Sequence, residues 1–145
     1  CEGRVPAPGP LTPEDNAILA AADGLLASCR TAFDGQQIHQ ALTALWGVVG
    51  DANRYFAGQA PWELKKKDPA RMGMVLYVTA ELVRIFAILT QPVMPDASAK
   101  LLDLVAVPAD ARTFAAIGKR LEPGTSLPAP AGVFPKVERE PDAAA

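Results

Sequence analysis

Residues 69–90 read PARMGMVLYVTAELVRIFAILT, and this run constrains the architecture more than any other part of the chain. Asp68 is a good helix N-cap, Pro69 suits the first helical turn, and Pro92 ends the same helix. Apolar residues cover most of the helical circumference, which is typical of a helix packed on several sides. We therefore predict a central helix over residues 69–90, with other helices around it.

The same run is apolar enough to raise the possibility of a membrane-spanning helix. Glu81 and Arg84 interrupt it three residues apart, on one helical face where they can pair. A stretch of about 18 apolar residues with two central charges fits a bilayer poorly, because charged side chains are costly there. A buried bundle helix is the better interpretation, and we expect no membrane partner.

Prolines and apolar periodicity divide the rest of the chain into helices. The 14 prolines are unevenly placed and leave residues 14–60 and 70–91 free. Apolar residues recur at i, i+3 and i+4 in these stretches, which is the helical pattern. The sequence predicts further helices over residues 13–31, 36–57, 96–105 and 110–117, and a loop with room for one helical turn at 59–67.

The predicted fold class is all-α, an up-down bundle of four to five helices. Within the second helix, Trp46 lies in the apolar stripe and is expected in the core, while Asp34 and Gly58 are expected to cap its two ends. We expect residues 1–138 to form one domain, because a chain of 145 residues is long enough for a single core. Residues 139–145 are expected to be a disordered tail.

A search for reactive clusters finds little. The one histidine, His39, has no cysteine or carboxylate group at ligand spacing, and Cys1 and Cys29 are too few for a disulfide framework. The chain contains no P-loop, no dinucleotide-binding glycine pattern and no nucleophile elbow. We therefore expect that this chain is not an enzyme by itself and that it holds no metal and no cofactor.

One segment carries a local charge that the whole chain lacks. The formal net charge is −2, so a strongly basic nucleic-acid binder is excluded and any such function needs a local patch. Residues 54–71 contain five lysines and arginines against Glu63 and Asp68, a local charge of +3. This segment is therefore the candidate for binding a polyanion.

Aromatic rings lie inside the same segment, at Tyr55, Phe56 and Trp62. A large ring in a proline-flanked turn beside cations can hold an unstacked base, because stacking contributes roughly 1–3 kcal/mol per base. We expect Lys65 and Lys66 to contact phosphates, on grounds of charge alone. The alternative remains that Trp62 is a lid on the bundle and that the lysines form a solvated turn.

At these residues the sequence resembles the anticodon-binding helical domain of methionyl-tRNA synthetases. The string DANRYF at residues 51–56, followed by APWEL at 60–64, is similar to the family's helix ending in Asn-x-Tyr and its Pro-Trp turn. The string LTQPVMP at 89–95 resembles the family's Pro-x-x-Pro corner, and GVFPK at 132–136 resembles its closing segment. The resemblance covers about residues 1–138.

The resemblance implies a role for particular residues. In that family the tryptophan of the Pro-Trp turn stacks with an anticodon base, so this role falls on Trp62, supported by Pro61. Asn53 and Tyr55 match positions that shape the same site. The resemblance also implies the bundle of the anticodon-binding domains of class I aminoacyl-tRNA synthetases, with the first helix of the family domain missing upstream.

The resemblance further implies partners and a cellular context. The expected partners are the anticodon loop of tRNA(Met) and the protein's own catalytic domain, with neither DNA nor a membrane. That domain would bind ATP and Mg and make the full-length parent a methionine–tRNA ligase of the cytoplasm. Two alternatives stay open, a helical protein–protein interaction module without RNA binding, and a sibling synthetase for isoleucine, valine, leucine or cysteine.

Overall fold

The computed structural model describes residues 3–134, which form five α-helices and two short 3-10 turns. The α-helices are α1 (Pro13–Asp34), α2 (Ile38–Gln59), α3 (Pro61–Lys67), α4 (Pro69–Thr90) and α5 (Pro95–Leu104). The 3-10 turns are η1 (Ala109–Ala111) and η2 (Phe114–Ala116). Within these described residues the only β pairing is one isolated bridge between Arg4 and Ser126, so the predicted all-α class is confirmed.

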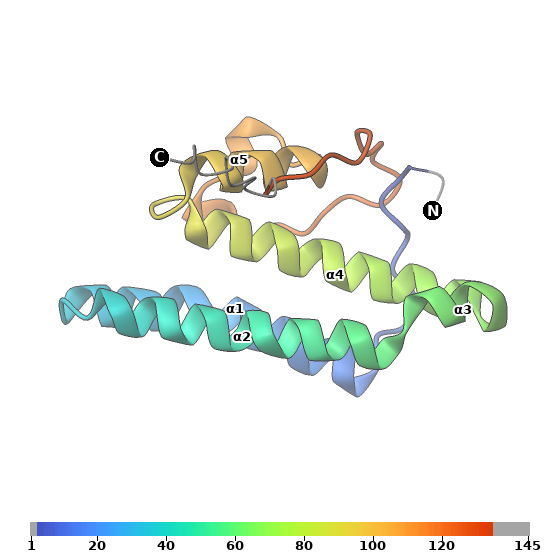
Figure 1. Cartoon of the computed structure of the whole chain (residues 1–145), viewed down its shortest axis with the longest axis horizontal. Coiled ribbons are helices and arrows are strands. Elements are labelled where there is room, and N and C mark those ends of the chain that lie inside the picture. Colours follow the sequence, from blue (N-terminus) through green and yellow to red (C-terminus); the bar gives the residue numbers. More distant parts are fainter. Residues whose placement is uncertain (1–2, 135–145) are drawn as a thin grey trace, which may run out of the picture.

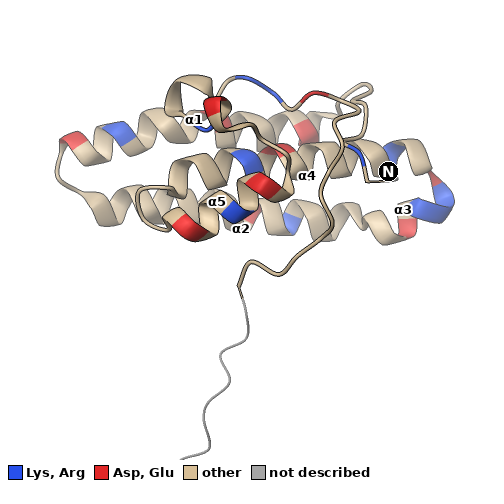
Figure 2. Ribbon diagram, turned by 90° about the horizontal axis from the view of Figure 1, so that it is seen from above, with Lys and Arg blue, Asp and Glu red and all other residues tan. Residues whose placement is uncertain are grey.

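The helices are arranged in layers around α4 (Figure 1). α1 and α2 form an antiparallel hairpin that packs on one side of α4, and α5 packs on the other side. α3 lies at one end of the molecule, where the chain passes from the hairpin to α4. The ribbon seen from above carries residues of both charge signs on α3 and near the start of α4 (Figure 2).

α4 is the central helix, as predicted. It is long and apolar enough to cross a membrane by length and composition, yet hydrophobic clusters cover two of its sides. On one side Val78, Leu82 and Ile85 pack against α1 and α2. On the other side Tyr77 and Ile88 pack against α5 and the segment that follows it. The interpretation as a bundle helix is therefore confirmed.

Two helices begin at a residue whose side chain caps them, and the cap at Asp68 was predicted. Thr12 forms a capping box with Asp15, and Asp68 accepts a hydrogen bond from the Arg71 backbone N–H. The expected cap at Asp34 is wrong, because α1 continues through that residue and Gln37 precedes α2.

Three other local predictions are wrong. Gly58 does not end α2, which runs to Gln59 before Ala60 takes the left-handed conformation. The expected loop at residues 59–67 is mostly the seven-residue helix α3. Trp46 is 50% exposed rather than buried, because the core-facing side of α2 is occupied by its neighbour Leu45.

The C-terminal part of the fold is tied to α4 by a group of charged residues that we call the Glu81 cluster (Asp23, Glu81, Arg84 and Arg120). The predicted Glu81–Arg84 pair is present and buried, with the Arg84 Nε and Nη2 atoms 3.0 and 2.9 Å from Glu81 Oε2. The Glu81 carboxylate also accepts from the Leu121 backbone N–H, and Arg120 joins Glu81 to Asp23 of α1. These bonds fix the segment after α5 against the helices, where two 3-10 turns replace the predicted fifth helix at 110–117.

Two sequence predictions concern the C-terminal end of the chain. The end of the closing segment at residues 135–136 and the tail at 139–145 lie outside the described residues. The boundary of the domain at residue 138 therefore stays a prediction.

Candidate nucleic-acid interface

A sharp corner joins α2 directly to α3. Ala60 is the single linking residue, with φ +44°, and this left-handed conformation costs an alanine about 1–2 kcal/mol. Its N–H donates to Phe56 O at 3.2 Å, and its carbonyl accepts from Glu63 N at 2.9 Å. Pro61 follows as the first residue of α3 and is buried. The ring of Pro61 fixes its φ, which limits where the next side chain can point.

Trp62 projects from this corner and is 60% exposed. The Phe56 ring, from the end of α2, meets the indole edge-to-face with centroids 6.1 Å apart and planes at 64°. Such a contact contributes about 0.5–1.5 kcal/mol beyond burial and limits the orientations of the indole. The ring is therefore supported on one side while much of its surface is open to solvent.

The cations of segment 54–71 are used in two different ways. Lys67 is 2.8 Å from Glu63, Arg54 pairs with Asp51, and Arg71 points inward to Asp15. Of the five, only Lys65 and Lys66 make no ion pair within the part of the chain that the structure describes. The +3 counted from sequence thus overstates the cations that are free to meet a ligand.

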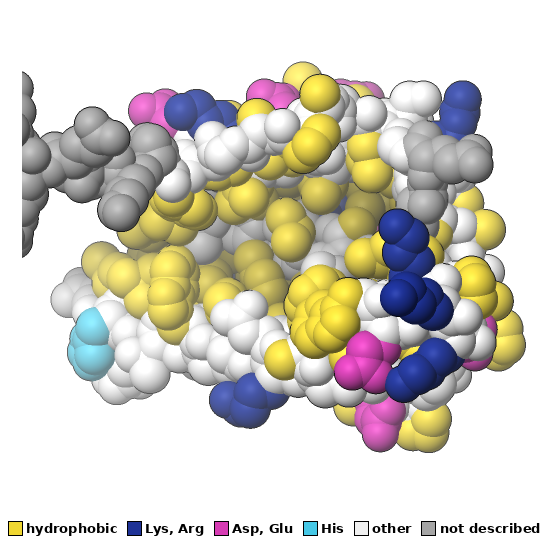
Figure 3. Space-filling model, turned by 45° about the vertical axis from the view of Figure 1, so that its right-hand side comes forward, with side chains coloured by type: hydrophobic (Ala, Val, Ile, Leu, Met, Phe, Trp, Pro, Cys, Tyr) yellow, Lys and Arg dark blue, Asp and Glu magenta, His cyan; other side chains and the backbone are white. Residues whose placement is uncertain are grey.

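The space-filling view shows the face of the molecule that includes the α3 end (Figure 3). Basic side chains gather at the α3 end of a hollow that is lined by hydrophobic side chains. The exposed pairs Lys67–Glu63 and Arg54–Asp51 contribute little to stability, because water and salt screen them. The surface at this end combines apolar and cationic groups, as single-stranded RNA sites do.

Residues 5–144 match the sequence model of a family described as the anticodon binding domain of methionyl tRNA ligase. The chain belongs to this family. The match includes the Pro-Trp corner, α4 and the segment after α5. This match favours the methionyl family over the synthetases for isoleucine, valine, leucine or cysteine.

Relatives of this anticodon-binding domain are named methionine–tRNA ligases. Those of Rhizobium meliloti and Mesorhizobium japonicum are 59% and 55% identical to it over 94% and 99% of this chain. This chain covers 27% and 28% of those two proteins, so it spans just over a quarter of their length.

Solved structures of methionyl-tRNA synthetase from Mycobacterium tuberculosis have the same fold. The apo form matches with a TM-score of 0.92 and 52% identity, covering 95% of this chain and 29% of that chain. The complex with methionyl-adenylate matches with a TM-score of 0.90 and 54% identity, covering 92% of this chain and 27% of that chain.

The structure brings four of the six candidate residues of this domain to one surface. Trp62, Lys65, Lys66 and Asn53 are exposed, and Asn53 lies one helical turn before Phe56, the ring that supports Trp62. Pro61 and Tyr55 lie deeper. The Tyr55 hydroxyl donates to Asp15 Oδ1 at 2.6 Å, so this side chain supports the corner from beneath.

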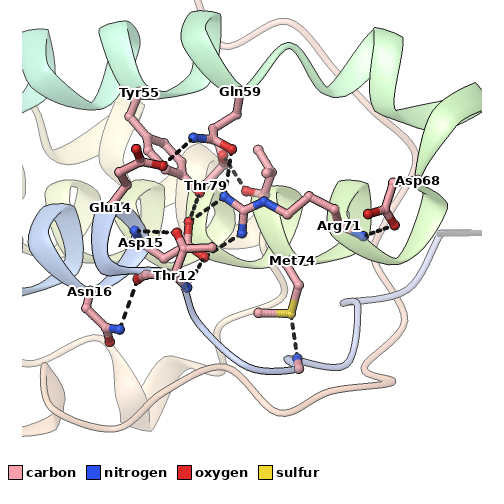
Figure 4. Close-up of polar contacts among 12 residues, drawn as sticks. Thr12, Glu14, Asp15, Asn16, Tyr55, Gln59, Asp68, Arg71, Met74 and Thr79 are labelled. Atoms are coloured by element: carbon pink, nitrogen blue, oxygen red, sulfur yellow. Dashed lines mark hydrogen bonds and ion pairs between the residues drawn. The ribbon is translucent and has the colours of Figure 1, made fainter.

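Beneath the corner lies a polar group that we call the Asp15 cluster (Thr12, Asp15, Tyr55, Gln59 and Arg71; Figure 4). The Asp15 carboxylate is fully buried and accepts from both terminal nitrogens of Arg71, at 2.5 and 2.9 Å. Arg71 also donates to Gln59 Oε1 at 2.6 Å. The cluster therefore joins α1, the end of α2 and the first turn of α4.

The charges of the cluster are stable at neutral pH. Burial raises the pKa of Asp15, but hydrogen bonds from Arg71, Tyr55 and Thr12 outweigh burial and hold this pKa well below its usual range. Burial and the hydrogen bond to Asp15 raise the pKa of Tyr55 well above its usual range. Asp15 is therefore an anion and the Tyr55 hydroxyl a donor.

Sequence reasoning missed the internal role of Asp15 and Arg71. The spacing of Thr12 and Asp15 signals a cap, but the pairing of Asp15 with Arg71 spans 56 residues and has no local signal. Arg71 was therefore counted among the cations of the patch.

Side chains that could hold a metal or act as a nucleophile are sparse among the described residues. Within residues 3–134 no group of three or more His, Cys, Asp or Glu side chains could hold a metal ion, and His39 is exposed. Burial raises the pKa of the Cys29 thiol, which makes it a poorer nucleophile. No acidic cluster within residues 3–134 could therefore hold the Mg of an ATP site.

Proposed function

We propose that this domain binds the anticodon loop of tRNA(Met) as part of a methionyl-tRNA synthetase, with Trp62 stacking on an anticodon base. The observation that supports this most is the indole itself, 60% exposed on a proline-initiated corner. A tryptophan sealed in the core could not meet a nucleotide. An indole held by Pro61 and Phe56 loses little freedom on binding, which favours affinity.

The residues around Trp62 would divide the recognition of RNA between them. The exposed amide of Asn53 can both donate to and accept from a base edge. Lys65 and Lys66 would meet phosphates, because their ammonium groups carry no ion pair within the described residues. Unstacked loop bases are the usual target of sequence-specific RNA binding, because their edges and faces are accessible.

The activity of the longer protein is a further part of the proposal. One relative structure, from Mycobacterium tuberculosis, is a complex with methionyl-adenylate. We expect the parent of this domain to attach methionine to tRNA, with ATP and Mg bound in a catalytic domain outside this chain. We expect this to occur in the cytoplasm, where translation takes place.

The test is binding of a fluorescent anticodon stem-loop of tRNA(Met) to the 145-residue chain. Trp62→Ala should weaken binding by about 5- to 150-fold, the equivalent of roughly 1–3 kcal/mol of stacking. Trp46→Ala is the matched control, because Trp46 is also half exposed but lies on the middle of α2. Equal affinities for the wild type and Trp62→Ala would contradict the proposal. In the parent, Trp62→Ala should impair aminoacylation while methionine activation without tRNA survives.

The family match disfavours the alternative of an interaction module without RNA binding, although hydrophobic residues are exposed away from the corner. Phe33, Val93 and Phe114 are exposed and border an apolar pocket at the end of the hairpin opposite α3. Binding of RNA with a log–log salt slope of a few charges supports the proposed function. Salt-insensitive binding of a protein, with no binding of RNA, supports the alternative.

A further inference from the structure

Arg71 contacts the residues at the two ends of segment 60–67, which contains the corner and α3. Its guanidinium donates to the side chain of Gln59, the last residue of α2, and its backbone N–H donates to the side chain of Asp68, the residue after α3. The two bonds measure 2.6 and 3.0 Å. The bond to Gln59 depends on the Arg71 side chain, whereas the bond to Asp68 is the N-cap of α4 and is made by the backbone at this position.

The guanidinium is itself held from the opposite side. Asp15 binds it bidentately, and the Arg71 side chain is only 17% exposed. Gln59 is also fixed at its other end, because its Nε2 donates to Glu14 Oε2 at 3.2 Å. The end of α2 is thereby anchored to α1 and α4, immediately before the left-handed residue Ala60.

We infer that Arg71 is a positioning residue for Trp62 rather than a contact for phosphate. This inference rests on the proposed binding of RNA. The clamp by Arg71 sets the angle at which α3 leaves α2, and so the direction in which the Trp62 indole faces. A lysine cannot replace it, because an ammonium group lacks the planar fork that reaches Asp15 and Gln59 together.

The orientation of Trp62 can be read directly. The chain has two tryptophans, so in a Trp46→Phe background 5-fluorotryptophan labels Trp62 alone and gives one ¹⁹F resonance. We expect a single narrow resonance from Trp62 in the protein that keeps Arg71. In Arg71→Ala and Arg71→Lys we expect the Trp62 resonance to be shifted, broadened or split. Circular dichroism at the same temperature establishes that each variant is folded.

Arg112→Ala is the matched control. Arg112 also pairs with a carboxylate, Asp103, and with backbone carbonyls, but on the far side of α4. The substitution removes the same charge and should leave the resonance unchanged. If Arg71→Ala does not fold, Gln59→Ala replaces it, because that change breaks the tie to α2 and leaves the Asp15–Arg71 pair in place.

Binding of the anticodon stem-loop then separates positioning from direct contact. Arg71→Ala should weaken binding by about tenfold in the presence of Trp62 and by less than twofold in the Trp62→Ala background, because coupled residues are not additive. Additive losses, or a ¹⁹F resonance as unchanged as in Arg112→Ala, would overturn the inference. If Trp62→Ala itself leaves binding intact, the proposed function fails, while the resonance still decides whether Arg71 positions the indole.

Discussion

Two carboxylates, Asp15 and Glu81, are fully buried in different parts of this fold and have different structural roles. Glu81 pairs with Arg84 three residues away on one helix, and Arg120 extends this cluster to α1. Asp15 pairs with Arg71 across 56 residues and lies beneath an exposed corner. The Glu81 cluster closes the fold around its C-terminal segment, whereas the Asp15 cluster supports the exposed corner at which we propose that RNA binds.

The largest effect is expected at Glu81. Glu81→Ala leaves the buried Arg84 without its carboxylate, and we expect unfolding to become easier by about 3–5 kcal/mol in urea denaturation. The double substitution Glu81→Leu/Arg84→Leu should recover much of this, because no buried charge is left unpaired. A loss below about 1 kcal/mol for the single variant would mean that this cluster is not essential to closure.

Asp15→Asn should cost less, about 2–3 kcal/mol at neutral pH. The reason is that Arg71 keeps partial access to water, whereas Arg84 is 2% exposed. Urea denaturation of both variants side by side measures the difference. Equal losses of unfolding free energy for Asp15→Asn and Glu81→Ala would show that access of water to the arginine does not distinguish the two clusters.

The same variant tests the charge of Asp15 through pH. The pKa of Asp15 is lowered in the folded protein, so the unfolded chain binds its proton first as the pH falls. The stability that the ionised carboxylate contributes is therefore full well above its usual pKa of 3.8 and is lost as the pH drops toward the lower folded pKa. The gap in unfolding free energy between the wild type and Asp15→Asn should narrow below about pH 4. A gap that stays constant from pH 7 to pH 3 would contradict this role.

The smallest effect on stability is expected at the exposed lysines. Lys65→Ala and Lys66→Ala should change the unfolding free energy by less than about 0.5 kcal/mol. Each should also reduce the log–log salt slope of binding to the anticodon stem-loop by about 0.7, the value for one single-strand phosphate contact. Lys100→Ala on α5 is the control of equal charge change, and an unchanged slope in all three variants would exclude Lys65 and Lys66 from phosphate contact.

Local signals predicted the elements that depend on neighbours in sequence. The period of the apolar residues in 69–90 predicted α4, and the three-residue spacing of Glu81 and Arg84 predicted their pair. The Pro61–Trp62 turn beside lysines was compatible with an exposed ring or with a lid on the bundle, and the ring is 60% exposed. These features could be read from sequence because helix geometry alone brings the side chains together.

Features that depend on tertiary packing could not be read. Nothing local marks Ala60 for the left-handed conformation, since glycine is the usual residue there and Gly58 stood two positions earlier. Trp46 was misplaced because the apolar stripe of α2 is wider than the face that α1 and α4 cover. The sequence does carry a signal for α3, with Pro61 at its start and Glu63 four residues before Lys67, but a run of three lysines is equally typical of a solvated loop.

The most direct test of base stacking compares the two tryptophans by fluorescence. One variant, Trp46→Phe, keeps Trp62 as its single indole, and the other, Trp62→Phe, keeps Trp46, which is exposed to a similar extent. Saturating anticodon stem-loop of tRNA(Met) should quench the emission of Trp62 strongly, because a stacked base contacts the ring, and leave the emission of Trp46 nearly unchanged. Quenching of neither indole, or equal quenching of both, would show that the Pro61–Trp62 corner does not hold a base.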